Sequence, residues 1–480
     1  MALGGQLRRL GTQSAIYGAG GIVSRLVAVA LLPIYTSYLR AVGYGRIEQV
    51  IAFSAVLVIL LRLGISSAFF RYYFDAEDDE GRTVVVRTAF WFTMAMATLG
   101  LVFGVAFAHP LSDWLKLHDP WLVIWAFVGL WAQMNYAQLT SVFRVEERPV
   151  SFAAASVANV LITIASTIVL VVVLGQGVRG AIVGNFLGTL SVYAVLLGYR
   201  RYQLGLQFDR ELFRQMNRFG MPLVPAALAL WAINFIDRFF VNQYKGNAEL
   251  GVYSLAVRIA SVIVFLMTAF QLAWPAFAYS IREDSVARRT YSFVLTYLLF
   301  VTCWISLALS ALSPWIVDVL DQSPGHGFAR ATEAVPLLCF ATAAYAGYTV
   351  LAIGIGRARQ TQYNWIVTGA AAVVNVALNV ALIPPYGMVG AAIATLAAYV
   401  ALFLGMWLNS RRVYPVAYQW RRVVLLAAAA GGLTAVARVL EVPLWVAIVL
   451  CLVYPLVLLP LGFSLPAERQ RLRRLVTSRA

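Results

Sequence analysis

Charged residues are scarce in this sequence. They make up 12% of its 480 residues, against roughly 25% in soluble domains, while 61% of the residues are apolar. A water-soluble fold of this size could not cover its surface with so few charges. The composition therefore excludes an ordinary soluble protein and indicates one that lies largely in lipid.

Cysteine and histidine are also rare, with three of each. Cys303, Cys339 and Cys451 all fall inside apolar segments, so we expect them to be packing residues rather than parts of a disulfide framework. The histidines are scattered with no metal-ligand spacing between them. We therefore predict no metal site and no cofactor.

The sequence lacks two features that would indicate an enzyme, one typical of ATP hydrolysis and one of sugar transfer. The sequence has no glycine-rich phosphate loop followed by Lys and Ser or Thr, which excludes ATP hydrolysis by that route. It also has no large outer loop with the acidic groups that a membrane glycosyltransferase or polymerase would need. We therefore expect that the protein is not an enzyme.

The apolar residues that are present occur in blocks of about 20, near the length at which a helix spans a bilayer. The blocks are continuously apolar, whereas the strands of a lipid-facing barrel alternate. We predict an all-α integral membrane protein with fourteen transmembrane helices, at residues 13–36, 47–70, 87–108, 120–143, 151–174, 179–199, 219–243, 252–279, 291–312, 333–356, 362–383, 387–409, 421–439 and 443–463.

The basic residues are unevenly distributed between the two predicted sides. If both ends of the chain are cytoplasmic, the inner segments hold 26 basic residues and the outer segments 7, as expected for cytoplasmic loops. The net charge of +16 then reflects topology and not nucleic-acid binding. We predict a multi-pass protein of a cytoplasmic membrane, with both termini cytoplasmic and with membrane lipid around it.

Weak internal similarity divides the chain. Because the repeated motifs lie at nearly constant offsets, we predict two pseudo-symmetric six-helix lobes related by an axis along the membrane normal. The N-lobe is residues 1–199, an amphipathic cytoplasmic linker is 200–218, the C-lobe is 219–409, and two further helices with a basic cytoplasmic tail form 410–480. The motif pairs are Gly45 with Gly251, Arg148-x-x-x-Phe152 with Arg359-x-x-x-Tyr363, and Gly177-x-x-Gly180-Ala181 with Gly387-x-x-Gly390-Ala391, at offsets of 206, 211 and 210.

Four arginines lie at membrane depth, where a charge is costly unless it faces a cavity or a partner. They are Arg25, Arg62, Arg238 and Arg258. A guanidinium keeps its proton and offers a planar fork of donors that matches phosphate oxygens in pairs. Four of them with a single carboxylate, Asp237, would make a positive cavity that suits an anion.

Polar neighbours extend these positions into two stripes on helix faces. The stripes are Asn234, Asp237 and Arg238 at i, i+3 and i+4, and Ser254, Arg258 and Ser261 at i, i+4 and i+7. The alternative for Arg238 and Arg258 is that they extend to the outer interface or that one of them pairs with Asp237. Asp237 either binds a coupling proton or cation or neutralises an arginine, and Arg258 is the favoured partner.

The sequence around these residues resembles that of bacterial Wzx-type polysaccharide flippases, in the superfamily that also holds the lipid II flippase and the multidrug and toxin extrusion (MATE) transporters. The most specific similarity is a Phe-Gly-x-Pro entry to the seventh helix, an Asp-Arg pair late in it, and a Gly-x-Tyr start to the eighth. These motifs lie in Arg218-Phe-Gly-Met-Pro-Leu-Val-Pro225, Asn234-Phe-Ile-Asp-Arg-Phe-Phe240 and Gly251-Val-Tyr-Ser-Leu-Ala-Val-Arg-Ile259.

The resemblance implies a MATE-like fold and a flippase that carries undecaprenyl-pyrophosphate-linked oligosaccharide to the outer leaflet of a bacterial inner membrane. It also implies that cavity arginines hold the pyrophosphate, a role that carries over to Arg25, Arg62 and Arg258. A polysaccharide polymerase or other assembly proteins would be its partners. The alternatives are lipid II transport and a MATE-type cation or drug antiporter, which would prefer cavity acids to arginines.

Overall fold

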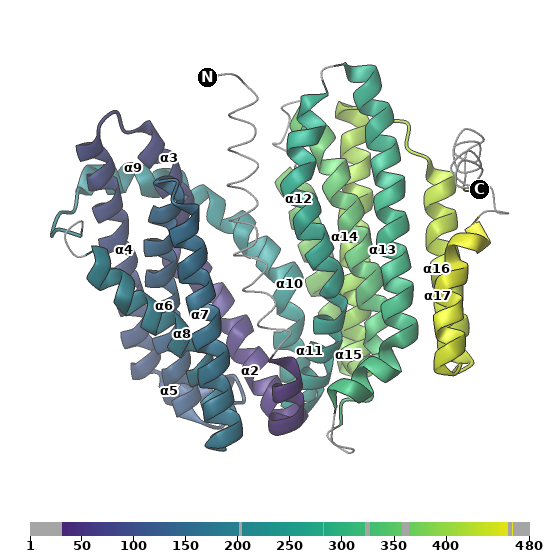
Figure 1. Ribbon diagram of the computed structural model, residues 1–480, viewed down its shortest axis with the longest axis horizontal. Coiled ribbons are helices and arrows are strands. Elements are labelled where there is room, and N and C mark those ends of the chain that lie inside the picture. The colour runs from purple at the N-terminus through teal and green to yellow at the C-terminus, as the bar shows by residue number, and fades with distance from the viewer. Residues whose placement is uncertain are drawn as a thin grey trace, which may run out of the picture. The chain divides into compact units, whose positions relative to one another are not determined.

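A computed structural model describes residues 31–200, 204–281, 283–321, 327–357, 364–458 and 463. Every regular element within these residues is helical, and no strand occurs among them. The contacts between described residues group into two compact units (Figure 1). The predicted all-α fold class is confirmed.

Unit 1 comprises Met1–Ser254, Leu320–Phe328 and Val376–Ala391. In the figure, α3 and α9 lie together at one end of this unit and α5 at the other (Figure 1). Its helices are α2 (Leu32–Arg62), α3 (Ile65–Asp75), α4 (Asp79–Ala106), α5 (Ala108–Trp114), α6 (Pro120–Val145), α7 (Pro149–Ile168), α8 (Gly177–Arg200), α9 (Arg210–Gly220), α10 (Val224–Lys245) and the first half of α11 (Asn247–Ala260).

Unit 2 comprises Leu255–Val319, Ala329–Asn375 and Ala392–Ala480. Its long helices run side by side (Figure 1). They are the second half of α11, α12 (Val262–Ser280), α13 (Asp284–Leu320), α14 (Ala331–Arg357), most of α15 (Asn364–Val413), α16 (Trp420–Val439) and α17 (Leu444–Leu458). The three cysteines lie in α13, α14 and α17 and are buried and free, as predicted.

Several helices extend beyond the apolar segments that predicted them. The segment 87–108 corresponds to α4, which starts at Asp79 because the Asp78 side chain caps it and accepts a hydrogen bond from Gly81 N. The segment 291–312 corresponds to α13, which is 37 residues long. Hydropathy locates the part of a helix that fits lipid, and capping decides where the helix starts.

In three places the helices divide the chain differently from the predicted apolar segments, and the backbone there is left-handed or bent. The segment 47–70 is broken between α2 and α3, where Leu63 and Gly64 both have positive φ. The segment 252–279 is divided at Ser261 into α11 and α12 with a bend of 41° up to Thr268. The segments 362–383 and 387–409 form α15, interrupted only at Gly387, where φ is 57°.

Nine helices among the described residues are long and apolar enough to cross a membrane, or ten if the bent α11–α12 pair is one span. This count takes α15 once, although Gly387 divides it, and most of the predicted segment 13–36 lies outside the described residues. The number fourteen and the division into six-helix lobes therefore stay predictions. The chain is a multi-pass α-helical membrane protein.

The amphipathic helix expected before residue 219 is α9. The Asp209 carboxylate caps it by accepting hydrogen bonds from the backbone amides of Glu211 and Leu212. Met216 on its apolar face is fully buried and packs in one cluster with Ile65 and Phe69 of α3. The α9 helix therefore packs against α3, at the predicted inner end of unit 1.

Candidate functional site

The α10 helix carries three of the predicted site residues, and the structure gives each a different environment. Pro225 occupies its first turn, where a missing amide proton costs nothing. Asp237 and Arg238 are buried, whereas Asn234 is exposed and its amide nitrogen donates to Leu230 O at 2.7 Å. The predicted stripe therefore turns its two charged members into unit 1.

Arg238 forms an ion pair with Glu48 of α2. The distance from Arg238 Nε to Glu48 Oε2 is 3.3 Å, and the two side chains are 9% and 2% exposed. The guanidinium also donates to Asn234 O at 2.8 Å and lies over the Phe235 ring. A buried charge without a partner would be strongly destabilising, so Glu48 and Arg238 each make the burial of the other tolerable.

Asp237 has a different partner. The fully buried Tyr253 of α11 donates a hydrogen bond from its hydroxyl to Asp237 Oδ2, and the Arg238 amide donates to Asp237 Oδ1 at 2.8 Å. Neighbouring residues on an α-helix project about 100° apart, which lets Asp237 and Arg238 face separate partners. Arg258 belongs to unit 2, so its pairing with Asp237 stays a prediction.

Two glycines, Gly45 and Gly251, bring the backbones of α2 and α11 into contact. A methyl group on Gly45 would lie 1.8 Å from Asn247 O, and one on Gly251 would lie 2.0 Å from Ala41 O. Ala41 and Gly45 precede Asn247 and Gly251 by the same 206 positions. Each contact is thus the image of the other, as at a two-fold axis, which is the relation that duplicated lobes would produce.

Further polar contacts join the end of α10 and the start of α11 to the end of α5 and the residues that follow it. Asn242 Nδ2 donates to Leu115 O at 2.9 Å, and Gln243 Nε2 donates to Trp114 O at 2.8 Å. Asn247 Nδ2 donates to Lys116 O at 2.7 Å. Together with the glycine crossings and the Glu48–Arg238 pair, these bonds form a continuous contact at the predicted outer end, which we call the outer contact layer.

The other predicted residues are not members of this layer, and one of them falls outside the described residues. Ser254 is buried, and its hydroxyl has no hydrogen-bond partner within the described part of the chain. Ser261 marks the α11–α12 bend and donates to Arg258 O at 2.6 Å. Arg62 lies in the last turn of α2, directly before the left-handed Leu63. Arg25 falls within residues 1–30, outside the described residues.

Sequence reasoning missed Glu48 and Tyr253. Glu48 lies one residue inside the predicted segment 47–70, where the uncertainty of a segment end makes a charged residue look like loop. Its position in a buried part of α2 adds a second carboxylate to the one expected. The signal that could have found it is a charged residue in the first turn of a predicted span.

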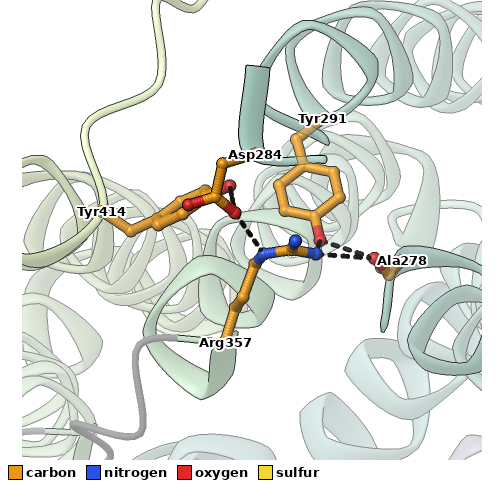
Figure 2. Close-up of polar contacts among 5 residues, drawn as sticks. All are labelled: Ala278, Asp284, Tyr291, Arg357 and Tyr414. Carbon is orange, nitrogen blue, oxygen red and sulfur yellow. Dashed lines mark hydrogen bonds and ion pairs between the residues drawn. The ribbon is translucent and has the colours of Figure 1, made fainter. Parts of the chain in front are cut away.

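Unit 2 holds a second polar cluster, centred on Arg357 at the end of α14 (Figure 2). Arg357 Nε donates to Asp284 Oδ1 at 2.9 Å, and Nη1 donates to Tyr291 Oη at 3.3 Å and to Ala278 O at 3.4 Å. The Tyr414 hydroxyl donates to Asp284 Oδ1 at 3.3 Å. This set, which we call the Arg357 cluster, joins the ends of α12, α14 and α15 to the start of α13.

The Arg357 cluster lies beyond the apolar part of α14, at the predicted inner end. Partial burial lowers the pKa of Arg357, but the hydrogen bonds to Tyr291 and Asp284 outweigh that effect, so the pKa lies above its ordinary value. Partial burial also raises the pKa of the Tyr414 phenol. Both groups therefore keep their protons at neutral pH, and the cluster retains its ion pair.

No group of three or more His, Cys, Asp or Glu side chains within the described residues could hold a metal ion. The site residues that are described are arginines, carboxylates, amides and hydroxyls on helices that are long and apolar enough to cross a membrane, counting the bent α11–α12 pair as one span. Such groups can bind and release an anion or a proton. The groups in α2, α10 and α11 are therefore of a kind that can bind an ion.

Comparison with known proteins shows the family of this chain. A family profile described as "Polysaccharide biosynthesis protein" matches residues 38–323, which include the outer contact layer. The chain belongs to this family. Relatives from Haemophilus influenzae include an uncharacterized membrane protein, 21% identical over 319 residues that cover 64% of this chain and 75% of the relative. Another, the Lsg locus putative protein 1, is 22% identical over 66% of this chain and 77% of its own.

Two solved structures have the same fold as this chain. The lipid II flippase MurJ in an inward closed conformation gives a TM-score of 0.74 at 14% identity, covering 92% of this chain and 97% of its own. An inward-facing MATE transporter of the MOP superfamily gives 0.68 at 16% identity, covering 84% and 95%. The expected fold, that of the superfamily of MurJ and the MATE transporters, is therefore confirmed.

Proposed function

We propose that this protein flips an undecaprenyl-pyrophosphate-linked oligosaccharide from the cytoplasmic to the outer leaflet of a bacterial inner membrane by alternating access. The observation that carries the proposal is the match of residues 38–323 to a polysaccharide biosynthesis family in a chain that folds like a lipid II flippase. Moving the pyrophosphate through a polar cavity avoids the cost of taking charge into hydrocarbon. No covalent bond changes, so the protein is not an enzyme.

In this proposal Arg25, Arg62 and Arg258 hold the pyrophosphate. Arginine suits this role because its planar donors bind phosphate oxygens in pairs and it stays charged at membrane depth. Arg238 is already held by Glu48, so it joins the substrate site only when α2 and α10 move apart. Asp237, bound by Tyr253, balances charge or binds a coupling ion.

The outer contact layer supports an alternating mechanism. Its glycine crossings, amide bonds and ion pair would hold the outer side closed while the head group enters from the cytoplasm, and they would separate as the outer side opens. Asn234, Ser254 and Ser261 would offer polar groups along the path. The termini would stay cytoplasmic, and a polysaccharide polymerase or other assembly protein would take over the flipped substrate.

The proposal is tested by changing Arg62 and Arg258, and Arg25 with them, to Ala and separately to Lys. Loss of one charged hydrogen-bonding group should reduce transport of a polyprenyl-pyrophosphate oligosaccharide in proteoliposomes by about tenfold to a hundredfold. Lys keeps the charge but loses the fork, so those variants should transport at intermediate rates. Surface-polysaccharide export in a strain that lacks the native gene gives a second readout.

Arg214→Ala is the matched control, because Arg214 is 81% exposed on α9 and has no role in the proposed cavity. The Arg214 variant should transport like the wild type. Wild-type rates in all the Ala variants of the cavity arginines, at equal protein levels, would rule out the anion-cavity mechanism.

Lipid II is the second candidate substrate, because the lipid II flippase MurJ shares the fold with a TM-score of 0.74. Both substrates contain a polyprenyl pyrophosphate, so the arginine variants do not separate them. Rescue of a lipid II flippase-depleted strain, compared with rescue of a polysaccharide-export mutant, does separate them. Rescue of only the first strain would assign lipid II as the substrate.

A further inference from the structure

A cavity of about 360 Å³ lies wholly within unit 2, where α13 ends, α14 begins and α16 ends. Its polar lining comes from Trp315 and Asp318 of α13, Thr332 of α14, Arg438 of α16, and Glu441 in the turn after α16. Apolar side chains fill the rest of its wall. Both the volume and the mixed lining are typical of a small-molecule site.

The charges of the lining distinguish this cavity from an anion site. Asp318 and Glu441 are exposed carboxylates, and Arg438 is the single partly buried guanidinium. Glu441 and Glu333 are the carboxylates whose charge acts on Arg438. Because acidic groups outnumber the one basic group, a phosphate in the cavity would meet net repulsion.

The same groups suit a neutral ligand that is rich in hydroxyls. Carboxylates accept hydrogen bonds from hydroxyl groups, and a guanidinium donates to hydroxyl oxygens. The indole of Trp315 adds a broad apolar face together with an N–H donor. A sugar ring offers the complement to this set, because it has hydroxyls around its edge and an apolar C–H face.

The surroundings place the cavity near the membrane boundary. Val319, Leu440 and Trp445 are 70%, 67% and 69% exposed close to the lining residues, which is normal for side chains that contact lipid or its head groups. In the predicted topology this boundary is on the outer side, opposite the Arg357 cluster. A lipid-anchored head group in the outer leaflet could therefore reach the cavity.

We propose that the cavity between the ends of α13, α14 and α16 binds one or two sugar units of a lipid-linked oligosaccharide on the outer side of the membrane. This proposal rests on the function proposed above and adds a second subsite to it. The arginines hold the pyrophosphate, while Trp315, Asp318 and Glu441 hold sugar. Such a subsite would favour the head group in its flipped position and reduce its return.

Sugar binding is tested directly with the full chain in phosphatidylcholine nanodiscs, free of sugar-headed detergent. Saturation-transfer NMR with maltotriose and with N,N′,N″-triacetylchitotriose as probes should show transfer to at least one of them. Trp315→Ala should weaken binding about tenfold, the size of a lost aromatic contact. Asp318→Asn, at an exposed position, should weaken it about fivefold.

Trp445→Ala and Asp113→Asn are matched controls, because the first removes an exposed indole and the second an exposed negative charge at the predicted outer end, and neither residue lines the cavity. They should bind like the wild type. Absence of transfer to both probes in the wild type, or equal transfer in the cavity variants, would overturn the proposal. Binding of free phosphoethanolamine that is lost in Trp315→Ala, without sugar binding, would instead assign the cavity to a phospholipid head group.

Transport separates this proposal from the flippase proposal itself. In proteoliposomes, Trp315→Ala and Asp318→Asn should slow net transport of a polyprenyl-pyrophosphate oligosaccharide, and Arg62→Ala should slow transport of the sugar-free polyprenyl pyrophosphate as well. No transport by the wild type, with sugar binding retained, would refute only the flippase function. Transport with unchanged rates in the cavity variants and no sugar binding would refute only the subsite.

Discussion

Two arginine–carboxylate pairs in this protein have similar distances and very different surroundings. Glu48 and Arg238 approach to 3.3 Å with side chains 2% and 9% exposed, whereas Asp284 and Arg357 approach to 2.9 Å with side chains 61% and 15% exposed. The Coulomb attraction between two charges is weak where water screens it, and an unpaired charge is costly only where water is excluded. Burial, and not distance, therefore decides what each pair contributes.

The buried pair should give the largest effect when one partner is removed. Glu48→Ala breaks the buried ion pair and leaves the Arg238 guanidinium without its partner on α2, so we expect a loss of about 3 to 5 kcal/mol of stability. Because Cys303, Cys339 and Cys451 are all buried, a thiol-reactive dye reports thermal unfolding of the detergent-solubilised protein. The double change Glu48→Gln with Arg238→Met removes both charges and should recover most of the loss. Unfolding of Glu48→Ala at the wild-type temperature would show that the pair is not buried in the native protein.

The glycine crossings next to the buried pair should give an intermediate effect. Gly251→Ala places a methyl group 2.0 Å from Ala41 O, so the backbones must separate, and overpacking of this kind costs about 1 to 3 kcal/mol. Gly431→Ala in α16 is the matched control, because a methyl group there has nothing within 4 Å. That change should be neutral or slightly stabilising, since alanine favours a helix. Equal unfolding temperatures for the two variants would contradict the close crossing.

The exposed pair should give the smallest effect. Asp284→Asn removes the charge opposite Arg357 but keeps an oxygen acceptor, so we expect a loss below about 1 kcal/mol. Raising the salt concentration should reduce the difference from the wild type further, because salt screens exposed charges and hardly affects buried ones. The unfolding temperatures of Asp284→Asn and Glu48→Ala, measured at low and high salt, test the comparison directly. A large, salt-independent loss in Asp284→Asn would show that the Arg357 cluster is buried.

The sequence predicted the helices well where lipid imposes the pattern. The apolar segment 179–199 corresponds to α8 and 421–439 to α16, because a helix in hydrocarbon must be apolar over its whole membrane-spanning length. Helix breaks were harder to predict. Leu63 and Gly64 turn the chain inside an apolar segment, and Gly387 turns it inside α15, where hydropathy does not change.

The candidate site was predicted in part. The spacing of Asp237 and Arg238 within an apolar segment was enough to select them as residues of interest, because charges at membrane depth are rare. Their partners were not predictable, since Glu48 and Tyr253 come from other helices and become neighbours only when α2, α10 and α11 pack together. The cavity of unit 2 to which we assign sugar binding was missed for the same reason, since its lining comes from three helices.

By itself, the sequence determined that this chain is a helical membrane protein and selected Asp237 and Arg238 as unusual charges in an apolar segment, because the cost of polar groups in lipid acts on each segment separately. The tertiary structure decided which carboxylate balances Arg238, how Gly45 and Gly251 form reciprocal crossings, and which residues of α13, α14 and α16 share a cavity. Those outcomes depend on contacts between segments that are distant in the chain, and such contacts cannot be predicted from local composition and spacing.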